Sequence, residues 1–281
     1  MRSGSPLVVP GAYDALSAKL VEAAGFDCVY MTGYGTSASL LGLPDIGLVS
    51  QAEMVDNARR MAGAVNVPLI SDADTGYGNA LNVARTVGEF ERAGVAAIHL
   101  EDQLAPKRCG HMSGKEVVPL GEMVEKVHAA VAARSDPDFV LIARTDARSV
   151  EGLDRALERA AAYHQAGADV LFVEAPETES EVAAIAEAFP EVPLMFNWVE
   201  RGRSPMLPLE TLAAMGFAIV IMPVATLFSA TAAMQRYLEE IRLKGTPLAL
   251  LDHAIDFDRF GELMNLPAIR SFEERISGLD C

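Results

Sequence analysis

One short pattern recurs four times along the chain, and it restricts the fold more than any other feature. Each copy is a helix-like segment that ends in a small or apolar residue and a glycine, followed three residues later by an apolar run. The copies are centred on Ala24-Gly25, Ala93-Gly94, Ala166-Gly167 and Met215-Gly216. Glycine suits the left-handed position that closes a helix, and an uninterrupted apolar run is typical of a buried parallel strand. The pattern therefore predicts an α/β fold with a parallel sheet.

Four further apolar runs lie between these copies and bring the number of predicted strands to eight. They are Leu7–Val9, Pro68–Ser71, Phe139–Ala143 and Pro193–Phe196. Helix-like segments alternate with the strands, and a chain of 281 residues is long enough for one closed barrel. An open doubly wound sheet is the alternative, but no G-x-G-x-x-G follows the first strand. We predict a (β/α)₈ TIM-type barrel over residues 1–245.

The chain continues beyond the eighth predicted strand. Residues 227–243 have the pattern of a long helix, residues 245–247 interrupt it, and residues 256–264 have the pattern of another helix. A closed barrel does not need this segment, so we predict a C-terminal helical extension over residues 246–281. The extension either packs on the barrel or crosses to a neighbouring subunit, and its residues alone favour neither arrangement.

An acidic composition bears on partners and location. The net charge of −16 and the pI of about 4.7 argue against nucleic acid or an anionic membrane as partner, and no apolar run is long enough to span a bilayer. No signal peptide is evident, and the three cysteines, Cys28, Cys109 and Cys281, lack metal-ligand spacing. We therefore expect a cytoplasmic protein with reduced cysteines.

Polar residues follow the predicted strands at the end where a barrel carries its active site. The set is Tyr30 and Thr32–Gly35 after the second strand, Asp72 and Asp74 after the third, Glu101 after the fourth, Arg144 after the fifth, Glu174 after the sixth and Asn197 after the seventh. Strand ends are often polar, so each residue alone indicates little. Their coincidence at one rim predicts a site.

The residue types in this set indicate its chemistry. The i, i+2 spacing of Asp72 and Asp74 places both carboxylates on one face of a strand, where they repel each other unless a cation lies between them. Mg²⁺ is the natural candidate because it takes oxygen ligands. Arg144 can clamp a substrate carboxylate, and the glycine-rich loop Thr32–Gly35 can offer backbone N–H groups to the same anion. A cation on the two oxygens of a 2-oxo acid stabilises its enolate, which permits carbon–carbon cleavage or formation.

The stretch Pro106–His111, which reads Pro-Lys-Arg-Cys-Gly-His, follows the fourth predicted strand and fits no helix or strand pattern. Two cations precede Cys109, and His111 follows it by two residues, an arrangement that lowers the pKa of a thiol or supplies a proton partner. The alternative is a basic surface loop with an incidental thiol. Its position after a strand that carries site residues favours a catalytic cysteine on a loop that moves over the site.

Together these motifs resemble the isocitrate lyase and phosphoenolpyruvate mutase superfamily. The resemblance covers residues 7–240 and rests on stretches that occur in the same order as in that family: Pro10–Ala15, Ser71–Gly78, Glu101–Gln103, Lys107–His111, Ala143–Asp146 and Asn197. The stretch around Cys109 is the most specific of them, because it marks the carbon–carbon lyase branch with 2-methylisocitrate lyases and 2,3-dimethylmalate lyases.

The resemblance implies a reaction. It implies a Mg²⁺-dependent lyase, with Mn²⁺ as an alternative ion, that cleaves a small carboxylate substrate. This substrate is a 2-hydroxy acid of the 2-alkylmalate or 2-methylisocitrate type, and the products are pyruvate and a carboxylic acid, formed through an enolate-like intermediate. Cys109 would protonate the carbanion of the departing acid, and Tyr30 matches the tyrosine that accepts the hydroxyl proton. Lys107, His111 and Arg144 would complete the catalytic set, with His111 supporting the loop.

The resemblance also implies binding residues and an assembly. The implied Mg²⁺ ligands are Asp72, Asp74 and, through water, Glu101. The residues implied for the pyruvate-like half are Thr32, Gly33, Tyr34, Asp45 and Arg144, and Gly110, Glu174 and Asn197 would line the rest of the substrate site. The family fold further implies a homotetramer in which C-terminal helices are swapped between barrels.

Two departures from the family pattern bear on the substrate. Methylisocitrate lyases carry an arginine just after the eighth strand, and its position here falls on Phe228. Residues 197–205 resemble the Asn-x-x-Glu-Gly-Gly-x-Thr-Pro stretch of dimethylmalate lyases and oxaloacetate decarboxylases. Both departures favour a substrate with a smaller, less charged second half, such as a 2-alkylmalate. Oxaloacetate decarboxylase, a phosphonate-bond mutase or hydrolase, and a non-catalytic barrel that binds a 2-oxo acid remain the alternatives.

Overall fold

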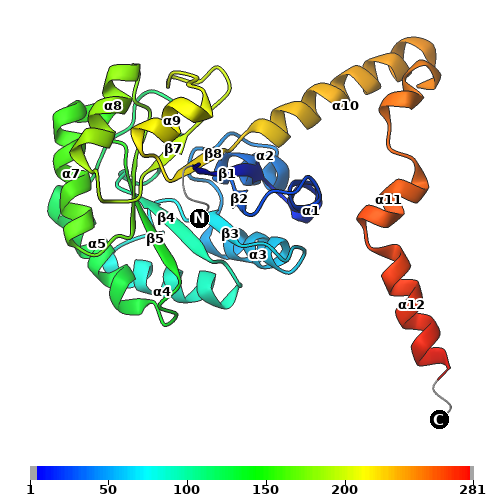
Figure 1. The fold of residues 1–281 in the computed structure, drawn as a ribbon, viewed down its shortest axis with the longest axis horizontal. Helices are drawn as coiled ribbons and strands as arrows, with labels where there is room; N and C mark the ends of the chain where they lie inside the picture. Colours follow the sequence, from blue (N-terminus) through cyan, green and yellow to red (C-terminus); the bar gives the residue numbers. More distant parts are fainter. Residues whose placement is uncertain (1–4, 279–281) are drawn as a thin grey trace. The chain divides into compact units, whose positions relative to one another are not determined.

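In the computed structural model, which describes residues 5–278, eight parallel strands form the centre of a compact unit that ends at Leu227 (Figure 1). The strands are β1 (Leu7–Ala12), β2 (Val29–Met31), β3 (Leu69–Asp72), β4 (Ala97–Glu101), β5 (Val140–Thr145), β6 (Val170–Val173), β7 (Met195–Asn197) and β8 (Ile219–Met222). Their order is β6-β5-β4-β3-β2-β1-β8-β7, and a single bridge between Leu171 and Leu194 joins the two outer strands. The sheet is therefore a nearly closed barrel, as predicted.

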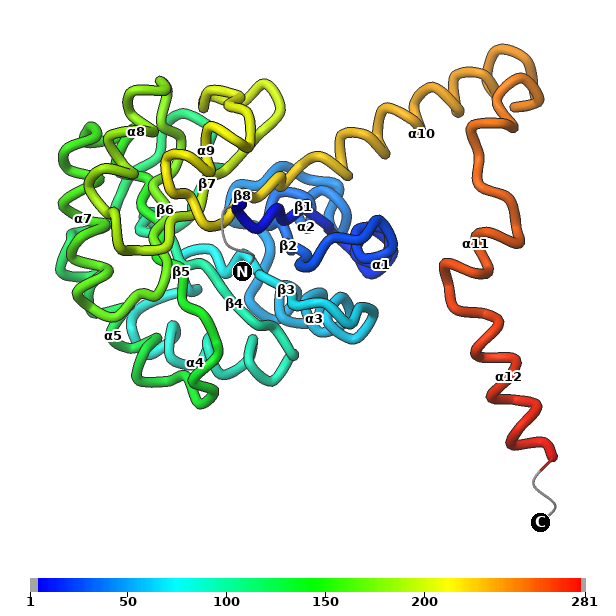
Figure 2. Tube along the Cα trace, in the orientation of Figure 1, coloured from blue at the N-terminus to red at the C-terminus, as the bar shows by residue number. Residues whose placement is uncertain are grey.

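Helices alternate with these strands. They are α1 (Ala15–Ala23), α2 (Gly33–Leu41), α3 (Gln51–Ala62), α4 (Ala80–Arg92), α5 (Leu120–Ala133), α6 (Arg148–Glu151), α7 (Leu153–Gln165), α8 (Glu179–Ala188) and α9 (Leu209–Met215). Figure 2 shows the chain running round the barrel in sequence order, with β8 returning beside β1. Every polar strand end predicted to form a site therefore faces the same rim of the barrel.

The repeated glycine pattern has the conformation expected from the sequence. Gly25, Gly94, Gly167 and Gly216 have φ values of 87°, 85°, 105° and 95°, and each follows the end of a helix by one or two residues. Residues with a Cβ atom rarely adopt such φ values. The glycines therefore allow each helix to end and the chain to turn into the next strand within a few residues.

The core has two layers because alternate residues of a strand point to opposite faces. The outer layer packs strands against helices and contains Met31, Leu69 and Ile98. The inner layer fills the barrel and includes Ile70, Ile142 and Phe172. Close packing of this kind keeps the strand ends at fixed separations, which a site assembled from several strands requires.

A second compact unit begins at Phe228. It contains most of α10 (Ala225–Lys244), a 3₁₀ segment η1 (Leu248–His253), α11 (Phe257–Leu263) and α12 (Leu266–Ser277). The helices predicted over residues 227–243 and 256–264 are both present. The boundary at residue 245, predicted from the sequence, falls at the end of α10, which starts in the barrel unit. Among residues 5–278, no helix is both long and apolar enough to cross a membrane.

Candidate active site

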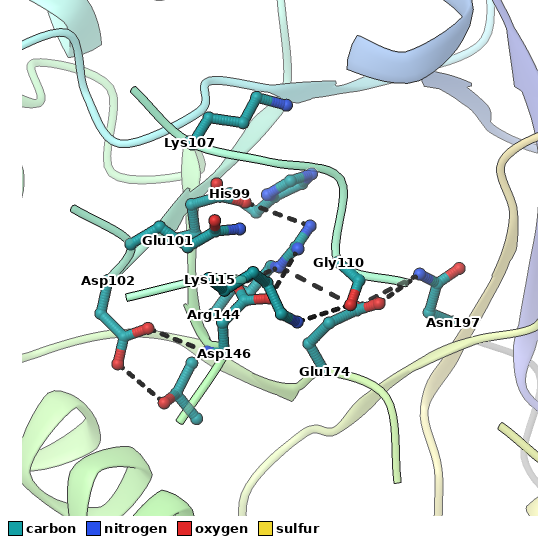
Figure 3. Close-up of polar contacts among 12 residues, drawn as sticks. His99, Glu101, Asp102, Lys107, Gly110, Lys115, Arg144, Asp146, Glu174 and Asn197 are labelled. Atoms are coloured by element: carbon teal, nitrogen blue, oxygen red, sulfur yellow. Dashed lines mark hydrogen bonds and ion pairs between the residues drawn. The ribbon is translucent and has the colours of Figure 1, made fainter. Parts of the chain in front are cut away.

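Charged side chains from neighbouring strand ends meet at the rim of the barrel (Figure 3). The strand register places Asp72 of β3 opposite His99 of β4, and Glu101 of β4 opposite Arg144 of β5. Glu174 follows β6, and its carboxylate accepts two hydrogen bonds from Nδ2 of Asn197 at the end of β7, of 3.1 and 3.2 Å. The structure thus brings together residues that the sequence places more than a hundred positions apart.

Arg144 lies at the centre of this cluster and is buried. Its Nε and Nη2 donate to the two carboxylate oxygens of Asp146 over 2.9 and 3.1 Å, and its Nη1 lies 3.2 Å from Oε2 of Glu101. Burial alone would lower the pKa of Arg144, but Asp146, Glu101 and Glu174 raise it well above its usual value. A guanidinium has five N–H donors, so Arg144 retains donors for a further anion beyond those that Asp146 takes.

Lys107 connects two acidic residues that lie far apart in the sequence. Its ammonium lies 2.6 Å from Oδ1 of Asp45 and 2.8 Å from Oδ1 of Asp74, and the side chain is almost fully buried. Burial would lower the pKa of Lys107, but Asp74, Asp72 and Asp45 raise it well above its usual value. Lys107 therefore stays charged and holds Asp45, which the sequence places in a loop after α2, against the end of β3.

Three carboxylates could hold a cation beside Lys107. Oδ1 of Asp72 accepts the backbone N–H of Asp74 over 2.9 Å, and His99, Lys107 and Arg144 keep the pKa of Asp72 below its usual value although burial acts against them. Oε1 of Glu101 is buried without a hydrogen-bond partner, while Oε2 of Glu101 and Oδ1 of Asp74 are buried in ion pairs with Arg144 and Lys107. Burial raises the pKa of Glu101 well above its usual range, so its carboxylate lacks a positive partner strong enough to offset its burial.

These donors fit a water-rich cation site. In the chain from residue 5 to residue 278, no three His, Cys, Asp or Glu side chains converge into a ready-made metal cage. Mg²⁺ does not require such a cage, because it usually keeps several waters and takes one or two carboxylates. Asp72 is suited to direct ligation, while Asp74 and Glu101 offer carboxylate oxygens to bound waters, beside their ion pairs with Lys107 and Arg144.

The Cys109 loop, residues 104–116, lies over the cluster. Its two ends are joined by a bridge between Gln103 and Val117 and by a 2.8 Å bond from Leu104 N to the Glu116 carbonyl. The backbone N–H of Cys109 donates to the Asp45 carbonyl over 3.1 Å. At Gly110, an added Cβ would lie 2.5 Å from both Arg144 Nη2 and Glu174 Oε1. A side chain at position 110 would therefore displace the loop from the site.

Cys109 is a neutral thiol in this arrangement. Burial raises its pKa to about 11, against the lowering effect of a backbone hydrogen bond from His111. The expectation that Lys107 and His111 lower this pKa is wrong, because both side chains are committed elsewhere. Lys107 pairs with Asp45 and Asp74, and Nε2 of His111 lies 3.1 Å from Oε1 of Glu174. A neutral thiol is suited to donating a proton.

A second loop, between β7 and α9, holds His111 in place. Arg203 donates from its backbone nitrogen to Nδ1 of His111 and from Nε to the His111 carbonyl, both over 2.9 Å. An added Cβ at Gly202 would lie 2.8 Å from Nδ1 of His111, so the close approach requires glycine there. The predicted supporting role of His111 thus has a partner that the sequence motif did not indicate.

Tyr30 of β2 and His99 of β4 form a buried pair. The Tyr30 hydroxyl lies 2.7 Å from Nε2 of His99, which is itself 3.6 Å from Oδ1 of Asp72. Burial raises the pKa of Tyr30 well above its usual value and lowers the pKa of His99. Both side chains are therefore neutral near pH 7, and a proton can pass between them.

The predicted glycine-rich loop after β2 is the first turn of helix α2. Thr32 is its N-cap, with Oγ1 accepting the Gly35 N–H over 3.3 Å. Position 33 is a glycine because the Asp72 carboxylate leaves no space there for a side chain. A helix N-terminus offers its first N–H groups to an anion, as the predicted loop would. Tyr34 is half-buried, and the Cys109 thiol and Asp45 contribute, after burial, to a raised pKa of Tyr34. Tyr34 therefore lies near the Cys109 loop.

Sequence reasoning missed Lys115. This lysine is buried and lies 2.7 Å from Oδ1 of Asp146. Nothing in the loop sequence distinguishes it from an exposed lysine, since a buried ammonium is recognised only by its partners. Phe228, which the family pattern singles out for the substrate, is 43% exposed and belongs to the second compact unit.

The chain is similar to a family model and to several known proteins. A family model for phosphoenolpyruvate phosphomutase matches residues 1–242. The 2,3-dimethylmalate lyase of Eubacterium barkeri is 51% identical over 267 residues, which cover 95% of this chain and 92% of that protein. A structure of oxaloacetate acetylhydrolase in complex with the inhibitor 3,3-difluorooxalacetate has a TM-score of 0.94 and 41% identity, over 99% of this chain and 95% of that one. A structure of phosphonopyruvate hydrolase with oxalate and Mg²⁺ has a TM-score of 0.88 and 34% identity, over 97% and 95% of the two chains.

Proposed function

Because the chain belongs to the phosphoenolpyruvate phosphomutase family, within the isocitrate lyase and phosphoenolpyruvate mutase superfamily, we propose that it is a Mg²⁺-dependent carbon–carbon lyase. Its substrate is a 2-hydroxy acid of the 2-alkylmalate or 2-methylisocitrate type, and its products are pyruvate and a carboxylic acid. The observation that carries the proposal is the neutral Cys109 thiol on a loop packed against Arg144 and Glu174. A mutase that moves a phosphoryl group from carbon to oxygen does not need an acid at that point.

Substrate binding uses the cations and N–H groups of the rim. The free donors of Arg144 and the first N–H groups of α2 take the carboxylate next to the hydroxyl-bearing carbon. Glu174, held by Asn197 and His111, keeps Arg144 charged and faces Gly110. Closure of the Cys109 loop then excludes water from the reacting carbon.

Bond cleavage requires one base and one acid. The substrate hydroxyl gives its proton to Tyr30, which passes its own proton to Nε2 of His99. A carbonyl forms at C2 as the C2–C3 bond breaks, and the electron pair goes to C3, where the neighbouring carboxyl group delocalises it as an enolate-like intermediate. The Cys109 thiol then donates its proton to C3, which completes the carboxylic acid product.

Mg²⁺ fits the donor set beside this chemistry. Asp72 would hold it, with Asp74 and Glu101 bound to its waters, and Mn²⁺ could take the same place. When bound, the ion would stabilise the negative charge on the oxygens of the oxo-acid product. The oxalate and Mg²⁺ in the phosphonopyruvate hydrolase structure support this assignment.

Oxaloacetate is the second candidate substrate. The similarity to oxaloacetate acetylhydrolase at a TM-score of 0.94 favours it, and the rim can bind any 2-oxo acid in the same way. Hydrolysis or decarboxylation of oxaloacetate, like phosphonate-bond chemistry, would use Arg144 to bind the substrate carboxylate and Asp72 to hold Mg²⁺. Decarboxylation and phosphonate-bond chemistry leave the negative charge on the oxo-acid enolate and so depend less on Cys109 than the lyase does, whereas hydrolysis to oxalate and acetate also leaves a carboxylic acid carbanion to protonate.

The test is a substrate panel with a matched variant. Purified protein is incubated with 2,3-dimethylmalate, 2-methylisocitrate, oxaloacetate and phosphonopyruvate. Pyruvate is read by a coupled lactate dehydrogenase, and loss of oxaloacetate, whose hydrolysis gives oxalate and acetate but no pyruvate, by malate dehydrogenase. The lyase proposal expects pyruvate from one of the first two, lost on adding EDTA and in Cys109→Ser. Turnover of oxaloacetate or phosphonopyruvate alone, with Cys109→Ser as active as the wild type, would instead establish an oxaloacetate decarboxylase or a phosphonate-bond enzyme.

We also propose a cytoplasmic homotetramer in which helices of residues 246–281 are exchanged between barrels. The proposal is supported by apolar side chains that lie exposed on the C-terminal unit when it is considered by itself, among them Leu238, Phe257 and Phe272. Exposed apolar patches of this kind are typical of contact surfaces. The proposed cytoplasmic location is supported by the need to keep the Cys109 thiol reduced.

A further inference from the structure

One buried lysine takes no part in the chemistry proposed above. Nζ of Lys115 donates to the Gly110 carbonyl over 2.5 Å and to Oδ1 of Asp146 over 2.7 Å, and only 2% of its side chain is exposed. Burying an ammonium is unfavourable unless its partners replace the lost water. The two partners therefore define what Lys115 does, and one of them adjoins Cys109.

Asp146 is shared between Lys115 and Arg144. Its Oδ1 accepts from Lys115 and from Nη2 of Arg144, while its Oδ2 accepts from Nε of Arg144. Its position on the barrel is fixed, because its backbone N–H donates to Oδ1 of Asp102 over 2.8 Å. Lys115, in contrast, belongs to the Cys109 loop, within the part closed off by the bridge between Gln103 and Val117.

The ion pair between Lys115 and Asp146 therefore joins the loop to the barrel. We propose that Lys115 is a positioning residue that couples closure of the Cys109 loop to the freedom of Arg144 to bind an anion, through the shared carboxylate of Asp146. With the loop open, Asp146 interacts with Arg144 alone and competes with a substrate carboxylate for its donors. With the loop closed, the Lys115 ammonium neutralises part of the negative charge on Oδ1 of Asp146. Asp146 then competes less strongly with a substrate carboxylate for the donors of Arg144.

This coupling makes binding and closure reinforce each other. An anion on Arg144 weakens its hold on Asp146, which leaves the Asp146 carboxylate available to Lys115 and so favours the closed loop. The Gly110 carbonyl, held by the same ammonium, then sets the backbone next to Cys109. The inference rests on the proposed function only where it treats Cys109 as the acid, and the coupling itself does not depend on the reaction.

The test uses two readouts that need no turnover. In full-length protein, the rate of iodoacetamide modification at Cys109 is followed by peptide mass spectrometry, and the affinity for oxalate with Mg²⁺ by calorimetry. The variants are Lys115→Met, Lys115→Arg, and Asp146→Asn, which keeps the volume of its side chain. Lys126→Met is the matched control, because Lys126 is equally buried but pairs with Glu122 on α5.

We expect Lys115→Met and Asp146→Asn to increase the modification rate of Cys109 by about tenfold or more, because an exposed thiol regains an ordinary pKa. We expect Lys115→Met to weaken oxalate binding by about tenfold, Lys115→Arg to recover part of both effects, and Lys126→Met to behave like the wild type.

Two results would overturn the inference. One is a modification rate in Lys115→Met equal to that of the wild type or of Lys126→Met. The other is faster modification with unchanged oxalate affinity, which would make Lys115 an anchor of the loop with no influence on Arg144. A wild-type protein without lyase activity would refute the proposed function and leave both readouts interpretable.

Discussion

The Cys109 thiol and the Lys107 ammonium lie two positions apart on the same loop, but their surroundings make the thiol neutral and keep the lysine positively charged. At Cys109 burial outweighs the lowering effects of a backbone hydrogen bond and of Arg144, so the pKa rises to about 11 and the thiol is neutral. Lys107 lies between Asp45 and Asp74, so its pKa rises despite burial and it keeps its charge. One loop thus supplies both a proton donor and a permanent cation.

The charge state of Cys109 can be measured directly. A thiol is reactive only as thiolate, and a raised pKa moves the thiolate to high pH. We expect the iodoacetamide modification rate of Cys109 in the unliganded protein to rise about tenfold for each pH unit from pH 7 to 10, with no plateau in that range. A plateau below pH 9 would show that the thiol is activated and would contradict its assignment as an acid.

The role of Lys107 can be measured as stability. Removing the cation in Lys107→Met leaves two buried carboxylates unpaired, and we expect the free energy of unfolding in urea to fall by about 3–5 kcal/mol. The double variant Lys107→Met/Asp45→Asn removes one of those charges as well and should be more stable than Lys107→Met alone. A double variant that is no more stable than the single one would mean that Lys107 does not act through Asp45.

At the scale of elements, the site is a rigid barrel rim covered by loops that hold each other. The Cys109 loop contacts Asp45 in the loop after α2 and Arg203 in the loop before α9. These contacts are hydrogen bonds between loops, and loops are the parts of a protein that open most readily. Opening and closing of the site is therefore expected to involve these loops, while the strands stay in place.

Arg203 offers a test of this loop contact. Arg203→Ala removes the Nε hydrogen bond to the His111 carbonyl but keeps the backbone bond to Nδ1. A lost hydrogen bond from a charged donor should lower kcat/KM by about tenfold. Arg155→Ala, which removes an exposed ion pair with Glu158 on α7, is the control and should leave kcat/KM unchanged. If both variants changed kcat/KM equally, the hydrogen bond from Arg203 to the His111 carbonyl would have no specific role.

The elements differ in how far the sequence predicts them. The strands and the glycines that precede them follow from local patterns, and so do the polar strand ends that form the rim. Contacts between loops do not, because they depend on positions that only the folded barrel brings together. Lys115 shows this most clearly, since its burial depends on Asp146 and Gly110 and on no feature of its own neighbours in the chain. The first turn of α2 was predicted as a loop because its two glycines are poor helix formers, whereas the Thr32 cap supports a helix there.

At the scale of the whole molecule, the barrel unit contains the rim residues, and the C-terminal unit exposes an apolar surface of its own. Leu238, Phe257 and Phe272 are each more than half exposed on that unit. Local patterns predicted its helices, but an exchange between subunits involves a surface on another copy of the chain. No local sequence pattern specifies such a surface, so the exchange remains a proposal.

The proposed tetramer has a simple consequence in solution. We expect light scattering after size exclusion to give four times the 30.0 kDa mass of one chain. A chain ending at residue 245 should elute at a smaller mass, because the exchanged segment is missing. A monomeric full-length protein, or a truncated chain that keeps the full-length mass, would contradict the exchange.

The most direct measurement of the proposed reaction is cleavage of 2,3-dimethylmalate in D₂O with Mg²⁺, followed by proton NMR. The wild type should form pyruvate together with propionate that carries one deuterium at C2, delivered from the Cys109 thiol after exchange with solvent. Cys109→Ser should form both products at least about a hundredfold more slowly while binding oxalate as the wild type does. Absence of pyruvate from the wild type with this substrate and with 2-methylisocitrate, or cleavage by Cys109→Ser at the wild-type rate, would contradict a lyase in which Cys109 is the acid.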